Sequence, residues 1–228
     1  MGQPKLRHEV KYLINTADYL TLRSRLKQIA RIDSHAGSDG TYQVRSLYFD
    51  TPDNQQLMKK INGISKREKF RLRFYNNELS LIRLEKKSKI NGLGSKVKTQ
   101  VTKEQCVRLL HNDFDWLFFS GDLLLQELYA RIKSQLLCPK TVVDYSREAY
   151  IYQPGNVRIT IDSNVRSGLF SNNFLDPELP TVDITQKGQV ILEVKFDEFL
   201  PELIRDIIQT NQRRSSSYSK YAACRMYG

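Results

Sequence analysis

Cationic side chains recur at every second position in several short segments of this chain. In segment 69–74, Lys and Arg alternate with Phe and Leu, and segments 83–87 and 193–195 mix glutamates into a similar pattern. Because successive side chains of a β-strand point to opposite faces, each such strand has one charged face and one face with apolar residues. If the apolar faces pack against helices and the sheet closes into a barrel, the charged faces line its interior. A barrel of this kind would hold a large polyanion.

An open sheet would produce the same pattern, with helices on its apolar face and water on its charged face. For any one of these residues taken alone, a solvated strand position is also the more common explanation. The repetition over several strands favours the barrel. We therefore predict an α+β fold: an antiparallel eight-stranded β-barrel tunnel with helices packed outside, as a single domain over residues 1–228.

The net charge of +11 over 228 residues points to an acidic partner, which is a nucleic acid, an anionic membrane or a phosphorylated molecule. The strand positions of the charges and the glutamates among them argue against nucleic acid. No apolar run reaches the length of a transmembrane helix, so we expect no direct membrane insertion. The three cysteines form no CxxC pair, which favours a reducing compartment, and we expect a cytoplasmic location.

Hydrophobic periodicity and turn residues place the elements along the chain. Asn76 and Asn77 form a tight hairpin turn. Strands are expected over residues 7–14, 42–50, 66–76, 79–88, 95–101, 140–152, 156–163, 181–185 and 189–197. Helices are expected over 17–30 with Thr16 as the cap, from Thr51-Pro52-Asp53 onward, over 103–111 and 121–137, and from Pro201.

The charged residues that share strand phase form the candidate lining. They are Glu9, Lys11, Lys69, Arg71, Arg73, Arg83, Glu85, Lys87, Lys96, Lys98, Arg147, Arg158, Glu193 and Lys195. Their positive charges repel one another, and a chain of phosphates would satisfy many of their donors at once. The three glutamates can pair with lysines when the tunnel is empty, and one or more can hold Mg²⁺ or Mn²⁺ against phosphate oxygens. Ser46, Tyr48 and Asp50 share the inward phase without an assigned role.

Several short motifs, in this order, resemble the catalytic domain of the vacuolar transporter chaperone (VTC) complex, a polyphosphate polymerase of the triphosphate tunnel metalloenzyme superfamily. They are Arg7-His8-Glu9-Val10-Lys11-Tyr12, Arg45-Ser46-Leu47-Tyr48-Phe49-Asp50, Lys69-Phe70-Arg71-Leu72-Arg73, Leu84-Glu85-Lys86-Lys87, Tyr145-Ser146-Arg147-Glu148-Ala149-Tyr150, Arg158-Ile159-Thr160-Ile161-Asp162, Leu192-Glu193-Val194-Lys195 and Ser217-Tyr218-Ser219-Lys220-Tyr221.

The resemblance implies transfer of the terminal phosphoryl group of ATP onto a growing polyphosphate, with release of ADP. It implies that Glu193 holds a divalent metal, Mn²⁺ or Mg²⁺, and that Ser219 and Lys220 bind phosphate near the tunnel mouth. Lys96 or Lys98 would supply a further tunnel cation. The phosphate contacts that it implies come from Lys11, Arg71, Arg73, Lys87, Arg147 and Arg158.

Two departures from the superfamily bear on function. Hydrolytic members carry a Glu-x-Glu-x-Lys motif on the first strand, and here Arg7 stands at its first glutamate, which favours the polymerase branch. The transmembrane segments of the membrane complex are absent from the sequence, so product export would need a membrane partner protein. A tripolyphosphatase or nucleoside triphosphatase and a non-catalytic polyphosphate sensor are the competing hypotheses.

Overall fold

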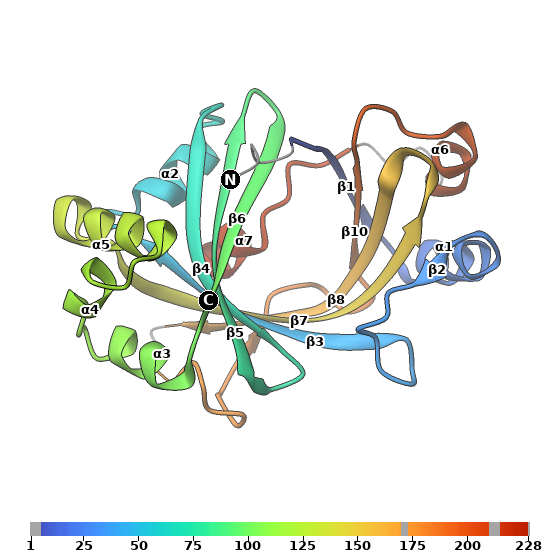
Figure 1. The fold of residues 1–228 in the computed structure, drawn as a ribbon. Helices are drawn as coiled ribbons and strands as arrows, with labels where there is room; N and C mark the ends of the chain where they lie inside the picture. The colour runs from blue at the N-terminus through green and yellow to red at the C-terminus, as the bar shows by residue number, and fades with distance from the viewer. Residues whose placement is uncertain (1–5, 170–172, 210–214, 228) are drawn as a thin grey trace.

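A strongly curled antiparallel sheet forms the centre of the computed structural model, which describes residues 6–169, 173–209 and 215–227 (Figure 1). Eight strands follow one another in the order β1-β10-β8-β7-β3-β4-β5-β6, and all neighbours are antiparallel. Their bounds are β1 His8–Ile14, β3 Thr41–Asp50, β4 Arg67–Tyr75, β5 Glu78–Ile90, β6 Leu93–Val101, β7 Cys138–Tyr152, β8 Val157–Leu169 and β10 Val190–Phe196. The short strands β2 (Arg31–Ile32) and β9 (Val182–Asp183) pair with β7 and β8. The predicted α+β fold with an eight-stranded antiparallel barrel is confirmed, and the curled sheet forms a half-barrel.

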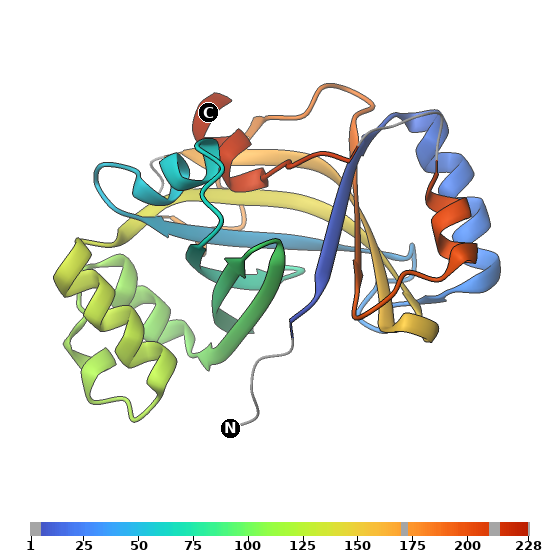
Figure 2. The ribbon, with the colours of Figure 1, turned by 90° about the horizontal axis from the view of Figure 1, so that it is seen from above.

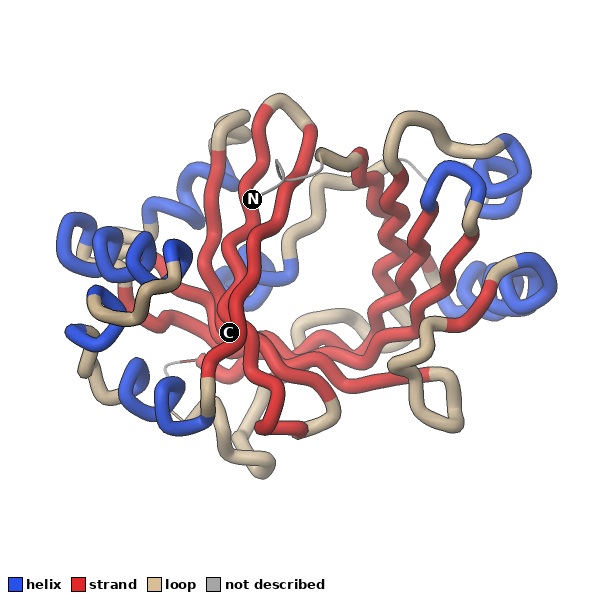
Figure 3. Tube along the Cα trace, in the orientation of Figure 1, coloured by secondary structure: helices blue, strands red, loops and turns tan. Residues whose placement is uncertain are grey.

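The two edges of the sheet meet at one point. Arg7, directly before β1, exchanges two backbone hydrogen bonds of 3.1 Å with Gly94 of β6. Figure 3 shows the strands curling around an inner side that β1 and β6 approach from opposite directions. The side of the sheet that faces this curl is called the inner face below.

Helices cover the outer face of the sheet in two groups (Figure 2). Leu72 and Leu84 of the sheet pack with residues of α3, α4 and α5. Ile159 and Leu192 pack with residues of α1 and α6 at the other end. Burial of these apolar side chains drives the packing of the helices on the sheet, since it covers the apolar positions of the alternating strands. The helix bounds are α1 Thr16–Ile29, α2 Gln55–Ile61, α3 Lys103–Leu110, α4 Asp115–Phe118, α5 Leu123–Gln135, α6 Glu202–Ile208 and α7 Lys220–Tyr227.

The last helix, α7, lies on the inner side and not outside. Its Tyr221 and Cys224 join a buried cluster with Tyr48, Tyr145 and Ile191, which are inward-phase residues of β3, β7 and β10. The Tyr221 ring lies 5.1 Å from that of Tyr48. A helix at this place brings C-terminal residues into contact with the inner face.

Local details differ from the sequence predictions at several element ends. Asn15, and not Thr16, caps α1. The Asn15 side chain accepts a hydrogen bond from the Asp18 backbone N–H, and the Asp18 carboxylate accepts one from the Asn15 backbone N–H. The second helix begins at Gln55, and β8 runs on to Leu169. Asn76 and Asn77 both have positive φ, as the predicted tight turn requires. No helix in the described part of the chain is long and apolar enough to cross a membrane.

Candidate functional site

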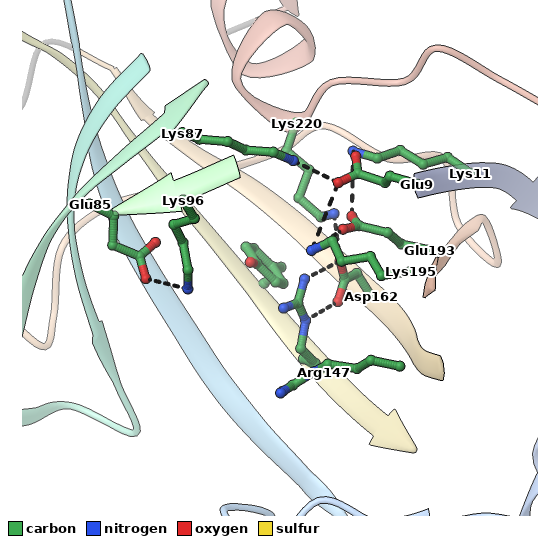
Figure 4. A network of polar contacts seen from close by, with 12 residues as sticks. Glu9, Lys11, Glu85, Lys87, Lys96, Arg147, Asp162, Glu193, Lys195 and Lys220 are labelled. Atoms are coloured by element: carbon green, nitrogen blue, oxygen red, sulfur yellow. Dashed lines mark hydrogen bonds and ion pairs between the residues drawn. The ribbon is translucent and has the colours of Figure 1, made fainter. Parts of the chain in front are cut away.

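Alternation along the strands sends the predicted charged residues to the inner face. Register pairs Glu9 with Lys195 and Lys11 with Glu193 across β1 and β10, and Lys69 with Lys87 across β4 and β5. Strand partners in register lie on the same face of a sheet. Figure 4 shows side chains from both halves of the sheet pointing toward the same interior.

Two glutamates and three lysines form the first cluster, on β1, β10 and β5. The Lys11 ammonium lies 3.0 Å from Glu9 Oε1 and 3.4 Å from Glu193 Oε2. Lys195 lies 2.6 Å from Glu193 Oε1, and Lys87 lies 2.7 Å from Glu9 Oε2. Burial and Glu193 raise the pKa of Glu9, but Lys11, Lys87 and Lys195 outweigh them and lower this pKa to about 2. Burial also raises the pKa of Glu193, but Lys11 and Lys195 hold it well below its usual range, so both carboxylates are ionised at neutral pH.

Arg147, Asp162 and Lys220 form the second cluster, where β7, β8 and α7 meet (Figure 4). Arg147 donates two hydrogen bonds to Asp162, of 2.6 and 2.8 Å, and the Lys220 ammonium lies 2.5 Å from Asp162 Oδ2. Asp162 is fully buried. Burial raises its pKa, but Arg147 and Lys220 lower it by more, so the carboxyl stays ionised. One carboxylate thus holds two cations in place.

The third cluster centres on Glu85 of β5, which is fully buried. Arg71 donates to Glu85 Oε2 at 2.8 and 2.6 Å, and Lys96 lies 3.0 Å from Glu85 Oε1. Arg73 lies beside this pair and donates 2.9 Å hydrogen bonds to the Ser46 and Tyr145 hydroxyls. Burial raises the pKa of Glu85, but the surrounding cations lower it well below its usual range. Glu85 therefore orients the guanidinium of Arg71 at the inner face.

Lys69 is a cation of the inner face that no carboxylate neutralises within the described residues. Its ammonium lies 3.4 Å from the Ser219 hydroxyl and 4.6 Å from the centre of the Tyr221 ring. Burial and then the neighbouring cations, led by Lys11 and Lys87, lower its pKa to about 7. Burial likewise lowers the pKa of Lys87 to about 8, although Glu9 opposes the shift. These two groups would gain most from a bound anion.

The remaining predicted residues lie opposite cluster residues in the strand register but make other contacts. Arg158 donates to Asp33, 2.5 Å away, and to the Tyr42 hydroxyl. The Arg83 guanidinium stacks on Tyr75, with 6.0 Å to the ring centre. Lys98 is exposed on β6 and makes no ion pair within the described residues. Of the two lysines left open by the sequence, Lys96 is thus the one that joins the clusters.

Several residues of the site were missed from the sequence or had no role there. Asp162 is in strand phase with Arg158, four residues before it, and this spacing could have indicated it. Tyr48 and Ser46 accept hydrogen bonds from Arg71 and Arg73, which gives these inward-phase residues a positioning role. Asp50 accepts from the backbone N–H groups of residues 56 and 57 and from the Tyr221 hydroxyl, so it joins α2 to α7.

The inner face offers few protein side chains that could coordinate a divalent metal. The described residues contain no group of three His, Cys, Asp or Glu side chains that could hold a metal ion. Glu9 and Glu193, which share Lys11, offer carboxylate oxygens of the kind that Mg²⁺ and Mn²⁺ prefer. Mg²⁺ is commonly bound by one or two carboxylates together with substrate phosphates. The pair fits a metal that binds together with a phosphorylated substrate.

Arg7, the residue that departs from the hydrolytic motif, lies beside this pair along β1. Its guanidinium is 2.9 Å from Asp197 Oδ1, and it also donates to the backbone carbonyl of Asn156. Asp197 is the first residue after β10. The Asn156 side-chain amide donates to the other oxygen of Asp197, so Arg7 and this carboxylate are tied to the turn between β7 and β8.

Comparison with known proteins agrees with the fold. A family model described as the VTC domain matches residues 6–227. No curated protein matches the sequence. The structure of a proposed adenylyl cyclase from Hippeastrum, described as having a dominant triphosphatase activity, is 14% identical with a TM-score of 0.53, covering 96% of this chain and 95% of that one. A proposed adenylate cyclase from Bacillus halodurans is 18% identical with a TM-score of 0.49, covering 91% and 87%. At these identities the similarity to the Hippeastrum structure concerns the fold alone.

Proposed function

The chain belongs to the VTC domain family, and on that basis we propose that it is a polyphosphate polymerase. In the proposed reaction a terminal oxygen of the polyphosphate chain attacks the γ-phosphorus of ATP. The bond from that phosphorus to the bridging oxygen of ADP breaks, the chain grows by one phosphate, and ADP leaves with the bridging oxygen. Such a transfer needs in-line positioning and positive charge around the phosphoryl oxygens more than any covalent participation of the protein.

The observation that carries the proposal is the surplus of cations over carboxylates on the inner face. Arg71, Arg147 and Lys220 are each oriented by a buried carboxylate, so their geometry is set before substrate arrives. Lys69 has no such partner among the described residues and would take its counter-charge from a phosphate. Arginine guanidinium groups match phosphate oxygens with paired donors.

Glu193 and Glu9 would hold the divalent metal with the phosphates, and we propose Mn²⁺ or Mg²⁺. When bound, the metal supplies neutralisation of charge on the phosphate oxygens. The protein side of the reaction is to bind two anionic chains, align them and limit access of water. Arg7 stands where hydrolytic members of the superfamily carry a glutamate, so a further carboxylate is missing beside the acidic pair, which supports transfer to phosphate over transfer to water.

We further propose that ATP and inorganic polyphosphate are the partners of this face, and that nucleic acid is not. The three cysteines are free, which supports a location in the reducing cytoplasm. Product export would then depend on a membrane partner protein.

The deciding experiment incubates purified protein with ATP and Mn²⁺ or Mg²⁺, and follows ADP, free phosphate and chain length. ADP together with a ladder of long polyphosphate supports the polymerase. Free phosphate without a ladder would instead identify a tripolyphosphatase or nucleoside triphosphatase, a candidate that the fold shared with the Hippeastrum protein favours. Tight tripolyphosphate binding without either product would identify a sensor.

A further inference from the structure

Cations on the inner face continue past the three clusters, along β4 and β5. Register pairs Arg67 with Lys89, next to the pair of Lys69 and Lys87. These residues share the inner strand phase, because they stand two positions apart on each strand and partners in register lie on one face. At roughly 3.4 Å per residue, the inner positions of β4 from Arg67 to Arg73 span about 20 Å. The charged row is therefore longer than the part of it that the three clusters use.

Lys60 of α2 lies close to this end of the row. Burial lowers the pKa of Lys60, and the like charges of Arg67, Lys11 and Lys89 lower it further. Burial likewise lowers the pKa of Lys89, although the charge of Glu9 opposes the shift. Because charges act on one another over only about 10 Å at physiological salt, the cations that affect Lys60 are its near neighbours. A third element thus adds a positive charge where β4 begins and β5 ends.

The charges at this end of the row lack counter-charges. Lys60, Arg67 and Lys89 are half-buried and form no ion pair within the part of the chain that the structure describes. The segments that carry them, 54–67 and 86–101, contain no aspartate or glutamate. Partial burial weakens the screening of their mutual repulsion, so this end of the row favours an anion.

The nature of this anion follows from the proposed polymerase, on which this inference rests. We propose that Lys60, Arg67 and Lys89 form a distal phosphate site, which binds phosphates of the polyphosphate chain beyond those at its reacting end. Three phosphates joined by two bridging oxygens are too short to reach both this site and the three clusters. Each further phosphate brings oxygens that can accept charge-assisted hydrogen bonds from an unpaired cation. The distal phosphate site makes the protein prefer chains longer than tripolyphosphate.

Calorimetric titration of the full chain in a chelator, with tripolyphosphate and with a linear polyphosphate several times longer, measures this preference. A longer chain also has more ways to bind, which alone favours it, so the variants decide. Arg67→Gln and Lys89→Gln should each weaken the longer chain about tenfold, the effect of losing a charged hydrogen bond, and tripolyphosphate by less than about twofold. The retained affinity for tripolyphosphate shows at the same time that the variant is folded.

Lys66→Gln is the matched control. It removes the same charge from an exposed position next to Arg67, outside the inner strand phase, and should not change the relative affinity for the two ligands. An equal loss of affinity for both ligands in Arg67→Gln overturns the proposal, because Arg67 would then belong to the site of the reacting phosphates. An effect of Lys66→Gln as large as that of Arg67→Gln also overturns it, since net charge alone would explain both.

Two further outcomes separate this inference from its alternatives. A single-stranded DNA oligonucleotide that binds as tightly as the longer chain, and loses the same affinity in Arg67→Gln, would overturn the proposal in favour of nucleic acid. Synthesis of a polyphosphate ladder from ATP by a protein whose chain-length preference is unaffected by Arg67→Gln and Lys89→Gln would refute the distal phosphate site and keep the polymerase. A preference lost in both variants, from a protein that makes no ladder, would support the site and refute the polymerase.

Discussion

Arg147 and Asp162 hold each other through two parallel hydrogen bonds on the inner face, and Lys220 shares the same carboxylate from a helix 58 residues farther along. The three side chains come from β7, β8 and α7, which no local sequence pattern connects. A single buried anion thus fixes a guanidinium and an ammonium at the place where phosphates are proposed to bind. The first prediction concerns this anion.

Asp162→Asn should lower the free energy of unfolding by about 3 kcal/mol, because it leaves two buried cations without their partner. Urea denaturation of the variant and the wild type measures this difference. Tripolyphosphate should restore part of the loss, since its oxygens can replace the carboxylate. Asp206→Asn, at an exposed position of α6, is the control and should change stability by less than about 0.5 kcal/mol. An equal effect of the two substitutions would refute the anchoring role of Asp162.

The second prediction is that the inner face takes up protons when it binds a polyanion. The pKa of Lys69 is lowered to about 7 and that of Lys87 to about 8, both first by burial. A bound phosphate favours the charged ammonium and raises both pKa values, so binding at pH 8 adds protons to the protein and weakens as pH rises from 7 to 9.

Calorimetry of tripolyphosphate binding at pH 8 in buffers of different ionisation enthalpy measures the uptake. Lys69→Arg should reduce it, because an arginine remains charged throughout this range. The difference in proton uptake between the wild type and Lys69→Arg contains no contribution from the ionisation of tripolyphosphate, because that contribution is the same for both proteins. Identical uptake in both would show that Lys69 does not titrate on binding.

The third prediction concerns the free energy of unfolding of the ligand-free protein, and it follows from the lowered pKa of Lys69. Between pH 7 and about 10, Lys69 binds more protons in the unfolded chain, where its pKa is near 10.4, than in the folded one. Stability therefore rises with pH in this window through this residue. Lys69→Met should flatten the rise in the free energy of unfolding between pH 7 and 9, whereas exposed Lys103→Met should not. A slope unchanged by Lys69→Met would contradict the low pKa.

The inner lining could be predicted from sequence because strand alternation has a period of two residues and is local. Lys69, Arg71 and Arg73 needed only their own strand to be assigned to one face. The pairing of charges could not be predicted, because it depends on which strands become neighbours. Asp162 meets Arg147 through the β7–β8 register, and Asp33 meets Arg158 from a loop 125 residues away.

The position of α7 on the inner side of the sheet could not be predicted from the sequence, for a different reason. An eight-residue helix has no preference between the two sides of a sheet until its neighbours exist. Its inner placement rests on buried contacts of Tyr221 with Tyr48 and on the hydrogen bond to Asp50. Both partners lie on β3, far away in sequence.

Tyr221→Phe tests this anchor and is the fourth prediction. The hydroxyl donates to Asp50 Oδ2 over 2.5 Å, and both residues are buried. Its loss should lower the free energy of unfolding by about 2 kcal/mol, as expected for a buried hydrogen bond to a charged group. Tyr12→Phe, whose hydroxyl has no hydrogen bond within the described part, is the control. Because Lys220 precedes Tyr221, tripolyphosphate affinity should also fall in the variant. Unchanged stability and affinity would mean that apolar packing alone holds α7.

The last prediction separates metal binding from anion binding at Glu193. This carboxylate lies 2.6 Å from Lys195 and 3.4 Å from Lys11, and these cations, led by Lys11, overcome burial and hold its pKa well below the usual range. Glu193→Gln should lower metal-dependent turnover of ATP about a hundredfold, the scale of losing one preorganised charge interaction. Metal-free tripolyphosphate binding should become tighter, because Lys11 and Lys195 lose their anion and the lining gains positive charge.

Turnover with Mn²⁺ and calorimetry in a chelator measure the two quantities on the same preparation. Glu127→Gln, which removes an outer carboxylate paired with Lys86 at 2.7 Å, should change neither. Opposite responses of turnover and binding would assign Glu193 to the metal, because a residue needed only for folding would weaken both together. A parallel loss of both in Glu193→Gln would therefore place this glutamate among the structural ion pairs of the inner face.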